Sequence, residues 1–379
     1  MVIGATKETF PAEKRVAITP ESVKSLLDKD LKIIVESGAG VLSGFSDEAY
    51  KENNARVLNK RAQVFSEADI LLQVRGAGAN PEKAEADIAL LKEGQILVGL
   101  LNPFAAPQLI KKIAEKGITA FAMELMPRTS KAQSMDVLSS MATIAGYKSL
   151  LIAASEIPKM FPLLMTAAGT IRPAHVFVIG AGVAGLQAIA TAKRLGAVVS
   201  AYDIREDVKE QVESLGAKFV ELKIEKKGQT EEKGYAKEMD EGFYKKQKEL
   251  LTEVLFENDI VITTAGVPGK KPPVLISKDM VKKMKPGSVI VDVVAESGGN
   301  CELTKAGKTI DENGVRIIGT INLPSLLPFN ASRLYSKNIT NFIFHVLKNG
   351  EIDMEDEITS STLITFEGEI TNSKLKEQL

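Results

Sequence analysis

The most specific chemical pattern in the sequence is a glycine-rich turn, Gly180-Ala181-Gly182-Val183-Ala184-Gly185. A G-x-G-x-x-G segment is weak evidence alone, but this one follows the apolar run 176–179 and opens a helical pattern over 183–195. In that setting Gly180 permits a tight turn, Gly182 lets the backbone approach a pyrophosphate, and Gly185 lets helix and strand pack closely. The free N–H groups of a helix N-terminus attract phosphate, so the pattern predicts a dinucleotide site.

An acidic residue after the next predicted strand indicates which dinucleotide is bound. Asp203 directly follows the run 198–202 and stands 18 residues after Gly185. Its carboxylate can accept hydrogen bonds from the adenosine ribose and would repel a 2′-phosphate, which favours NAD over NADP. Arg205 is close in sequence and weakens this exclusion a little. The predicted cofactor contacts from this region are Gly180, Gly182, Val183, Ala184, Gly185, Asp203, Arg205 and, after the run 260–263, Gly266.

A polar loop over 126–140 is the next segment that could carry chemistry, and it holds Arg128, Gln133, Asp136 and Ser139. Two interpretations stay open from the residues alone. The loop could be polar only because Ser134 or Asp136 caps the helix that follows. Alternatively it could face a cleft and contact a ligand, because ligands bind between domains and beyond the carboxyl ends of strands.

The composition is that of a globular protein with more than one domain. The 379 residues are 44% hydrophobic and 26% charged, with a formal net charge of −1. This length predicts two or three domains, and the charge balance argues against nucleic acid as the main partner. A single cysteine, Cys301, excludes an internal disulfide and a thiolate metal cluster, so we expect a cytosolic protein without a metal site. We find no run of about 18 apolar residues and no signal peptide, and therefore expect no membrane-spanning helix.

Short apolar runs alternate with helical patterns along the chain, which predicts an α/β fold. The predicted strands are 2–5, 32–36, 70–74, 96–100 and 119–123 in a first series, then 176–179, 198–202, 218–220, 260–263, 288–293 and 315–318 in a second. This rhythm is typical of parallel sheets covered by helices on both faces. We therefore predict two doubly wound Rossmann-like domains with a cleft between them. The first comprises 1–135 and, discontinuously, 327–379, and the second comprises 136–326.

Three helical segments support that division. The segment 20–29 is predicted to begin after Thr19 as N-cap, with Pro20 at the first helical position. The Ala-, Ser- and Met-rich segment 134–161 is predicted to be largely a helix that joins the domains. In the tail, 335–347 is predicted to be helical, and the tail is expected to cross back onto the first domain.

Two further features bear on function. The segment 223–248 is crowded with Lys and Glu, which is typical of a solvated loop with a charged helix but also of a mobile flap over a ligand. The only two histidines, His175 and His345, are interpreted as ordinary structural residues. Histidine is the most frequent general acid or base, so its scarcity disfavours proton-transfer chemistry.

At this point long, gap-free stretches of the chain resemble a known family, the NAD(H)-binding component of proton-translocating NAD(P) transhydrogenase. The resemblance covers nearly the whole chain. It is carried by residues 122–128, 132–140, 165–170, 182–196, 211–218, 234–239, 284–290 and 298–301. Stretches of this length are more specific than a shared Rossmann fold.

The resemblance implies a function and a set of roles. The loop with Arg128, Gln133 and Asp136 is similar to the loop that holds the nicotinamide ring of NAD(H) in this family, with Ser139 just beyond. Tyr235 is similar to the tip residue of a mobile loop that closes over bound nucleotide. The family component is a homodimer that docks with a separate NADP(H)-binding subunit on a membrane-embedded proton-channel subunit. Hydride passes directly between the two nicotinamide rings, coupled to proton translocation, which implies a cytoplasmic protein held peripherally at the membrane. Because the chain ends at Leu379 without membrane helices, we expect a separate peripheral subunit.

The same fold resembles alanine dehydrogenase, which is the alternative. Arg15 stands where that family holds a substrate carboxylate with arginine. However, Asn102 replaces its catalytic histidine, Arg75 its substrate-binding lysine, and Glu296 its aspartate. Arg and Lys are not interchangeable at a binding site, so the amino-acid site looks dismantled. Hydride transfer between two nicotinamides needs aligned rings rather than a base, which suits a site without histidine.

Overall fold

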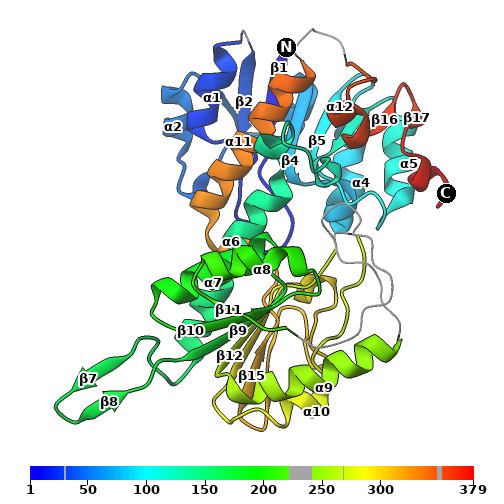
Figure 1. Ribbon diagram of the computed structural model, residues 1–379. Coiled ribbons are helices and arrows are strands. Elements are labelled where there is room, and N and C mark those ends of the chain that lie inside the picture. The colour runs from blue at the N-terminus through cyan, green and yellow to red at the C-terminus, as the bar shows by residue number, and fades with distance from the viewer. Residues whose placement is uncertain (30, 222–240, 268, 348–351) are drawn as a thin grey trace. The chain divides into compact units, whose positions relative to one another are not determined.

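The computed structural model describes the chain except residues 30, 222–240, 268 and 348–351 and the side chains of 241–246 (Figure 1). It divides into two compact units. Unit 1 comprises Met1–Met141 and Pro324–Leu379, and unit 2 comprises Ala142–Leu323. Each unit is built on its own sheet. Tyr235 and most of the predicted flap 223–248 lie outside the described residues.

The sheet of unit 1 has the strand order β17-β16-β6-β5-β4-β1-β2-β3. Its strands are β1 (Val2–Ala5), β2 (Lys32–Glu36), β3 (Arg56–Leu58), β4 (Ile70–Arg75), β5 (Ile96–Leu100), β6 (Thr119–Ala122), β16 (Leu363–Phe366) and β17 (Glu369–Ile370). From β3 to β6 every pairing is parallel, as predicted. The edge of the sheet was not predicted: there β16 pairs antiparallel with β6 and with β17. Glu367 and Gly368 both have positive φ, 48° and 82°, which suits a tight hairpin turn.

The sheet of unit 2 has the order β11-β10-β9-β12-β13-β15-β14. Its strands are β9 (His175–Ile179), β10 (Val198–Tyr202), β11 (Lys218–Phe219), β12 (Ile260–Thr263), β13 (Val289–Asp292), β14 (Thr309–Glu312) and β15 (Val315–Ile318). Here too the edge departs from the prediction, because β14 runs antiparallel to β15. The turn residues Asn313 and Gly314 have φ of 54° and 78°, the Asn-Gly signature of a two-residue hairpin. That signal is present in the sequence and could have located β14.

Helices cover both sheets (Figure 1). They are α1 (Pro20–Leu27), α2 (Asp47–Glu52), α3 (Arg61–Glu67), α4 (Pro81–Leu90), α5 (Pro107–Glu115), α6 (Val137–Glu156), α7 (Val183–Arg194), α8 (Lys209–Ser214), α9 (Glu241–Glu257), α10 (Lys278–Val281), α11 (Pro328–Val346), α12 (Glu357–Thr362) and α13 (Ser373–Lys376). Proline opens α1 and α11, where a missing N–H costs nothing. The predicted helix at 335 therefore begins earlier, at Pro328. Thr19 is the N-cap of α1, as predicted, but within the described chain its side chain makes no capping bond.

Helix α6 is long and apolar enough to cross a membrane by length and composition alone, which the search for apolar runs did not anticipate. Leu150 and Ala153 of this helix are fully buried in the core of unit 2. At Gly146, an added Cβ would lie 2.0 Å from the carbonyl oxygen of Ala184, so α6 packs directly against the first turn of α7. These contacts are those of a core helix, and they help to position the start of α7.

Strands β7 (Leu164–Thr166) and β8 (Gly169–Ile171) form a separate antiparallel hairpin in unit 2 that was not predicted. It projects from the body of its unit in Figure 1. Met165 on this hairpin is 81% exposed, and Leu163 just before it is 56% exposed. Large apolar side chains left this open on a two-stranded element are typical of a contact surface.

Candidate functional site

The glycine turn after β9 has the geometry that its sequence predicts. Gly180 has φ of +97°, and an added Cβ would lie 2.6 Å from the hydroxyl oxygen of Thr264. At Gly185 an added Cβ would lie 1.8 Å from the carbonyl oxygen of Gly180. Both glycines are therefore required by the packing of turn, strand and helix. At Gly182, in contrast, no described atom lies within 4 Å of an added Cβ, so the fold itself does not require glycine there.

The open position at Gly182 coincides with the N-terminus of α7. Gly182 is the N-cap residue, and in the described chain no side chain caps the helix there. The first N–H groups of a helix have no acceptor within the helix, and they carry the positive end of its dipole. Open space beside the N–H groups of Val183 and Ala184 fits a pyrophosphate. The residues at the start of α7 therefore fit the predicted NAD cofactor.

Asp203, directly after β10, supports this turn. Its carboxylate Oδ2 accepts a hydrogen bond from the backbone N–H of Ala181 at 2.7 Å. Arg205 donates its backbone N–H to Oδ1 at 2.9 Å and its Nη2 to Oδ2 at 3.1 Å. Asp203 and Arg205 are therefore an ion pair on the same edge as the glycine turn. A ribose hydroxyl that bonded Asp203 would share the carboxylate with Arg205.

Two residues that the sequence analysis did not select hold the loop with Gly266. The hydroxyl of Thr264 donates to the carbonyl of Gly180 at 2.9 Å, which ties the ends of β12 and β9 together. Asn300 is fully buried; its Oδ1 accepts from Ala265 N–H at 3.0 Å and its Nδ2 donates to the Ala265 carbonyl at 2.7 Å. Thr264 could have been found from its place at the end of β12. Asn300 is brought to the loop only by the tertiary fold.

In unit 1, the polar loop 126–136 is a series of short turns that ends in α6. The 3₁₀ turn η4 (Gln133–Met135) carries Gln133, which is exposed, as is Arg128 earlier in the loop. Asp136 accepts from the Ser139 backbone N–H at 2.9 Å and from its hydroxyl at 2.6 Å. The structure thus brings Asp136 and Ser139 together as a cap on α6. Capping and ligand contact do not exclude one another, because Gln133 and Arg128 remain at the surface of the loop.

A second group of polar residues lies at the end of β1 in unit 1. Arg15 donates from Nε and Nη2 to the two oxygens of Glu13 at 2.8 and 2.7 Å, and both side chains are buried. Arg75 Nε lies 3.3 Å from the same carboxylate, and its guanidinium lies 4.3 Å from the Phe10 ring centre. Glu8 accepts from the backbone N–H groups of Val74 and Arg75 at 2.6 and 3.0 Å. Arg15 and Arg75 therefore both contact the carboxylate of Glu13.

The carboxyl groups of Glu8 and Glu13 have very different pKa values. Burial would raise the pKa of Glu13, but the charge and hydrogen bonds of Arg15 outweigh it and lower that pKa to about 2. Burial and the nearby charge of Glu13 raise the pKa of Glu8 to about 8. Burial also raises the pKa of Glu124 to about 7, and this carboxyl group accepts from the backbone N–H groups of Leu101 and Asn102. Asn102 itself has a left-handed backbone, with φ of +43°.

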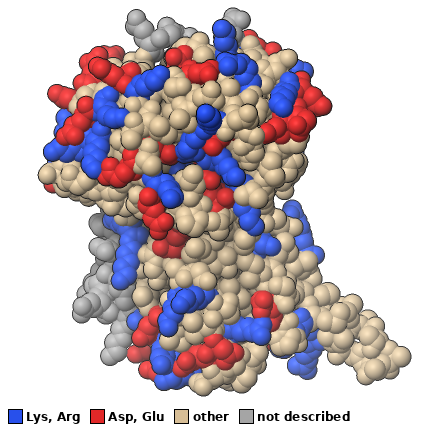
Figure 2. Space-filling view, turned by 180° about the vertical axis from the view of Figure 1, so that it is seen from behind, with Lys and Arg blue, Asp and Glu red and all other residues tan. Residues whose placement is uncertain are grey.

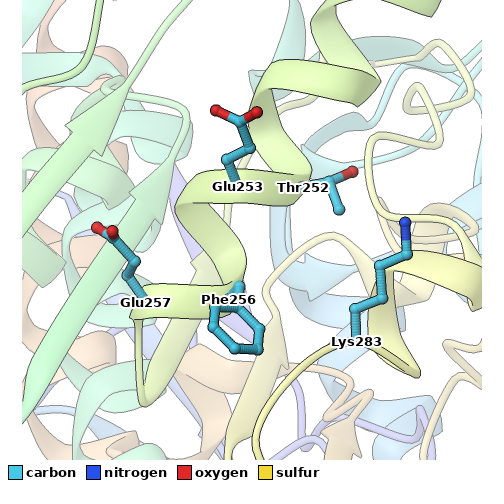
Figure 3. Close-up of a pocket in the computed structure, with 5 residues that line it drawn as sticks. All are labelled: Thr252, Glu253, Phe256, Glu257 and Lys283. Atoms are coloured by element: carbon cyan, nitrogen blue, oxygen red, sulfur yellow. The ribbon is translucent and has the colours of Figure 1, made fainter.

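A surface pocket of about 650 Å³ lies elsewhere on unit 2, between the end of α9 and the segment after α10 (Figure 3). It is lined by Thr252, Glu253, Phe256, Glu257 and Lys283. Helix α9 leads into the amino end of β12, whereas the glycine turn follows the carboxyl end of β9. In a parallel sheet these are opposite edges, and ligands of such folds bind at the carboxyl edge. The pocket is therefore not the dinucleotide site.

The visible surface carries charges of both signs. On the face in Figure 2, Lys and Arg side chains alternate with Asp and Glu side chains over the described parts of both units. No extended basic patch gathers among the described residues of this face. Nucleic-acid binding depends on such a patch.

Together the strand order, the glycine turn and the open start of α7 define a protein of the Rossmann, dinucleotide-binding class. Comparison with known proteins then identifies the family. Models of the N-terminal and C-terminal domains of "Alanine dehydrogenase/PNT" match residues 4–145 and 149–373. The chain belongs to this family.

Several similar proteins are transhydrogenase subunits. The chain is 47% identical to the first of the polypeptides that make up NAD(P) transhydrogenase subunit alpha of Rhodospirillum rubrum, over 100% of both chains. It is 44% identical to NAD(P) transhydrogenase subunit alpha of Haemophilus influenzae, over 97% of this chain and 71% of the relative. Alanine dehydrogenase 1 of Staphylococcus aureus is 29% identical, over 99% of this chain and 96% of the relative.

Solved structures agree with this order of similarity. The crystal structure of transhydrogenase from Sinorhizobium meliloti matches with a TM-score of 0.86 and 40% identity, over 99% of this chain and 100% of that one. An L-alanine dehydrogenase matches with a TM-score of 0.81 at 24% identity, which shows the shared fold. The resemblance to the transhydrogenase component and the two-domain Rossmann-like fold predicted from the sequence are both confirmed.

Proposed function

We propose that this chain is the NAD(H)-binding subunit of a proton-translocating NAD(P) transhydrogenase. The observation that carries the proposal is the uncapped N-terminus of α7, where Gly182 leaves open space that the fold does not need. Relatives at 43 to 47% identity that bear the transhydrogenase name support the same assignment.

The residues divide the work of binding. The N–H groups of Val183, Ala184 and Gly185 bind the pyrophosphate, and Gly180 and Gly182 let it approach. Asp203 and Arg205 contact the adenosine ribose, and Gly266 lies in the loop that Asn300 holds. Tyr235 is proposed to close over the nucleotide, although it lies outside the described residues.

The loop with Arg128, Gln133, Asp136 and Ser139 is proposed to hold the nicotinamide ring. Bound NAD(H) supplies the hydride chemistry, and the chain supplies orientation. Hydride moves between two ring carbons without a proton, so the reaction gains most from alignment and needs no general base. The Asp136–Ser139 hydrogen bonds support this role because they hold two polar side chains in one geometry before the nucleotide arrives.

Partners follow from the same proposal. An NADP(H)-binding subunit accepts the hydride, and a membrane-embedded proton-channel subunit couples the transfer to proton translocation. The chain is then a peripheral protein on the cytoplasmic face of the membrane. A homodimer is proposed as well. The exposed apolar side chains of Met165 on the projecting β7–β8 hairpin and of Leu163 just before it support a self-association surface.

The alternative is an amino-acid dehydrogenase, which the full-length relatives at 29% identity favour. Two observations weaken it. Arg15 and Arg75 already contact Glu13, and Asn102 stands where that reaction would place histidine. An amino-acid dehydrogenase needs a base to take the proton from the substrate nitrogen. NADH oxidation in the presence of pyruvate and ammonia would revive this alternative.

Stopped-flow hydride transfer tests the main proposal. The protein is mixed with NADH and a purified NADP(H)-binding transhydrogenase component carrying an oxidised NADP analogue. We expect rapid, partner-dependent transfer, and we expect Gln133→Ala or Asp136→Ala to slow it by about 10- to 100-fold, since misplacing the ring loses alignment. Binding of NADH, followed by fluorescence, should change much less.

Gln63→Ala is the matched control, because Gln63 is an exposed glutamine on α3 of unit 1 and lies far from the loop in sequence. It should transfer hydride at the unmodified rate. Tight NADH binding without transfer to any such partner would overturn the proposed function.

A further inference from the structure

The loop 126–136, which is proposed to hold the nicotinamide ring, is held partly by its own hydrogen bonds and partly by contacts from outside it. Its 3₁₀ turn η4 is a single turn of three residues, Gln133–Met135. The hydrogen-bond geometry of a 3₁₀ turn is poorer than that of an α-helix, so contacts from outside contribute to holding it. Two of these contacts come from a helix about 200 residues later in the chain.

Two asparagines of α11 bind the same atom of this turn. Asn338 donates from Nδ2 to the carbonyl oxygen of Ser134 at 2.9 Å, and Asn341 donates from Nδ2 to the same oxygen at 3.1 Å. They are three residues apart and so lie on one face of the helix. Ser134 is flanked by Gln133 and lies two residues before Asp136. The two asparagines thus hold the backbone between Gln133 and Asp136, the side chains that are proposed to align the ring.

Helix α11, which carries both asparagines, is itself anchored to the sheet of unit 1. Tyr335 is fully buried and donates its hydroxyl to the carbonyl of Gln73 on β4 at 2.8 Å. Phe342 is also fully buried and packs edge-on against Phe121 of β6, with ring centres 5.3 Å apart. Both contacts fix α11 on the sheet of unit 1. Through α11, the sheet therefore helps to set the position of the Ser134 carbonyl.

A second contact ties the loop to the same C-terminal region. Lys131 lies 2.8 Å from Asp356, which also accepts from His345 at 2.7 Å and caps α12 through the N–H groups of Ile358 and Thr359. Lys131 is 67% exposed, however, and exposed ion pairs contribute little. The asparagine pair, of which Asn338 is buried, is the stronger hold.

We propose that Asn338 and Asn341 are positioning residues for hydride transfer, acting through the Ser134 carbonyl on Gln133 and Asp136. The inference rests on the proposed function and names a part of the site that lies outside the loop. Loss of both amides removes the two hydrogen bonds by which α11 holds the Ser134 carbonyl, and η4 can then shift. A displacement of about 1 Å is enough to cost up to about 100-fold in a reaction governed by alignment.

The test uses the full chain with variants at these positions. Asn341→Ala removes one donor from a partly exposed residue, and Asn341→Asp keeps the size but removes the donor. The Asn338→Ala/Asn341→Ala double variant removes both donors. Asn330→Ala is the matched control, because Asn330 is an exposed asparagine on the same helix. We expect hydride transfer at saturating nucleotide to slow by about tenfold in the double variant, with NADH affinity kept within about threefold.

Asn341→Asp should slow transfer at least as much as Asn341→Ala, because the lost donor and not lost volume is the cause. A merely structural role predicts the opposite pattern, namely a lower melting temperature with an unchanged transfer rate for the folded protein. That result would overturn the proposal. If the double variant does not fold, the two Asn341 variants still decide it.

Combination with Gln133→Ala separates this proposal from the proposed function. If the asparagines act through the loop, adding Gln133→Ala to the double variant should slow transfer much less than the product of the separate effects. Independent, multiplicative effects would overturn the positioning role. If Gln133→Ala alone leaves transfer unchanged, the role of Gln133 fails and the positioning proposal fails with it. If the unmodified protein transfers no hydride to any such partner, the proposed function fails instead, whatever the asparagines do.

Discussion

The two units share one strand order, but the segments that follow their equivalent central strands differ in chemistry. Unit 1 runs β3-β2-β1-β4-β5-β6, and unit 2 runs β11-β10-β9-β12-β13-β15, so β1 and β9 occupy equivalent places. After β9 the chain offers glycine, an uncapped helix and open space at Gly182. After β1 it offers Glu8, Glu13 and Arg15, which satisfy one another and the neighbouring backbone.

The difference shows what makes this edge a binding site. Strand order alone places backbone ends and loops at the same position in both units. In unit 1 the chain supplies its own anions to the arginines there. In unit 2 no side chain of the described residues caps the N-terminus of α7, so an anion from outside is the natural partner. Three predictions test this contrast, in order of expected size.

The largest effect is expected from Glu13→Ala in unit 1. It leaves the buried Arg15 guanidinium without its bidentate partner, and breaking a buried ion pair in this way costs about 3–5 kcal/mol. Chemical denaturation measures the loss in free energy of unfolding. Glu85→Ala is the control, because the Glu85–Lys112 pair is exposed and should cost under about 1 kcal/mol. Equal effects of the two substitutions would show that the buried group does not stabilise unit 1.

The next effect is a split between two glycines of unit 2. Gly185→Ala places Cβ 1.8 Å from the Gly180 carbonyl oxygen and should destabilise the protein by about 1–3 kcal/mol through overpacking. Gly182→Ala meets open space and should leave the melting temperature unchanged while weakening NADH binding about tenfold, or about 1.4 kcal/mol. Thermal unfolding and NADH titration measure the two quantities. If Gly182→Ala binds NADH normally, the open start of α7 is not the phosphate site.

The smallest effect per step of the measurement is a pH dependence in unit 1, which is spread over several pH units. The folded protein holds the pKa of Glu8 at about 8, above its ordinary value of 4.5. A raised pKa means that the unfolded chain releases this proton first, so the stability contribution is complete below pH 4.5 and is lost as the pH rises toward 8. The slope is at most about 1.4 kcal/mol per pH unit. Glu8→Gln should flatten the fall in unfolding free energy between pH 5 and pH 7, and an unchanged slope would contradict the assignment.

Much of this molecule could be predicted because its signals are local. The glycine turn, the apolar strands and the proline-started helix α1 each depend on a few adjacent residues, and the structure confirms them. The Asn313-Gly314 signal is equally local, although the predicted strands did not include β14. The antiparallel strand β16 could not be located in the same way, since its pairing with β6 joins residues more than 200 positions apart.

The candidate site also has local features that the sequence reveals and long-range features that it does not. The sequence by itself determined the chemistry on offer, which is a phosphate-binding turn with Asp203 after the second strand and a polar loop that carries Gln133 and Asp136. Only the tertiary structure decided how these parts are held, through Asn300 on the Gly266 loop and through Asn338 and Asn341 on Ser134. The physical reason is range. A turn conformation is set by the residues within it, whereas a hydrogen bond to a distant carbonyl exists only after the whole unit has folded around it.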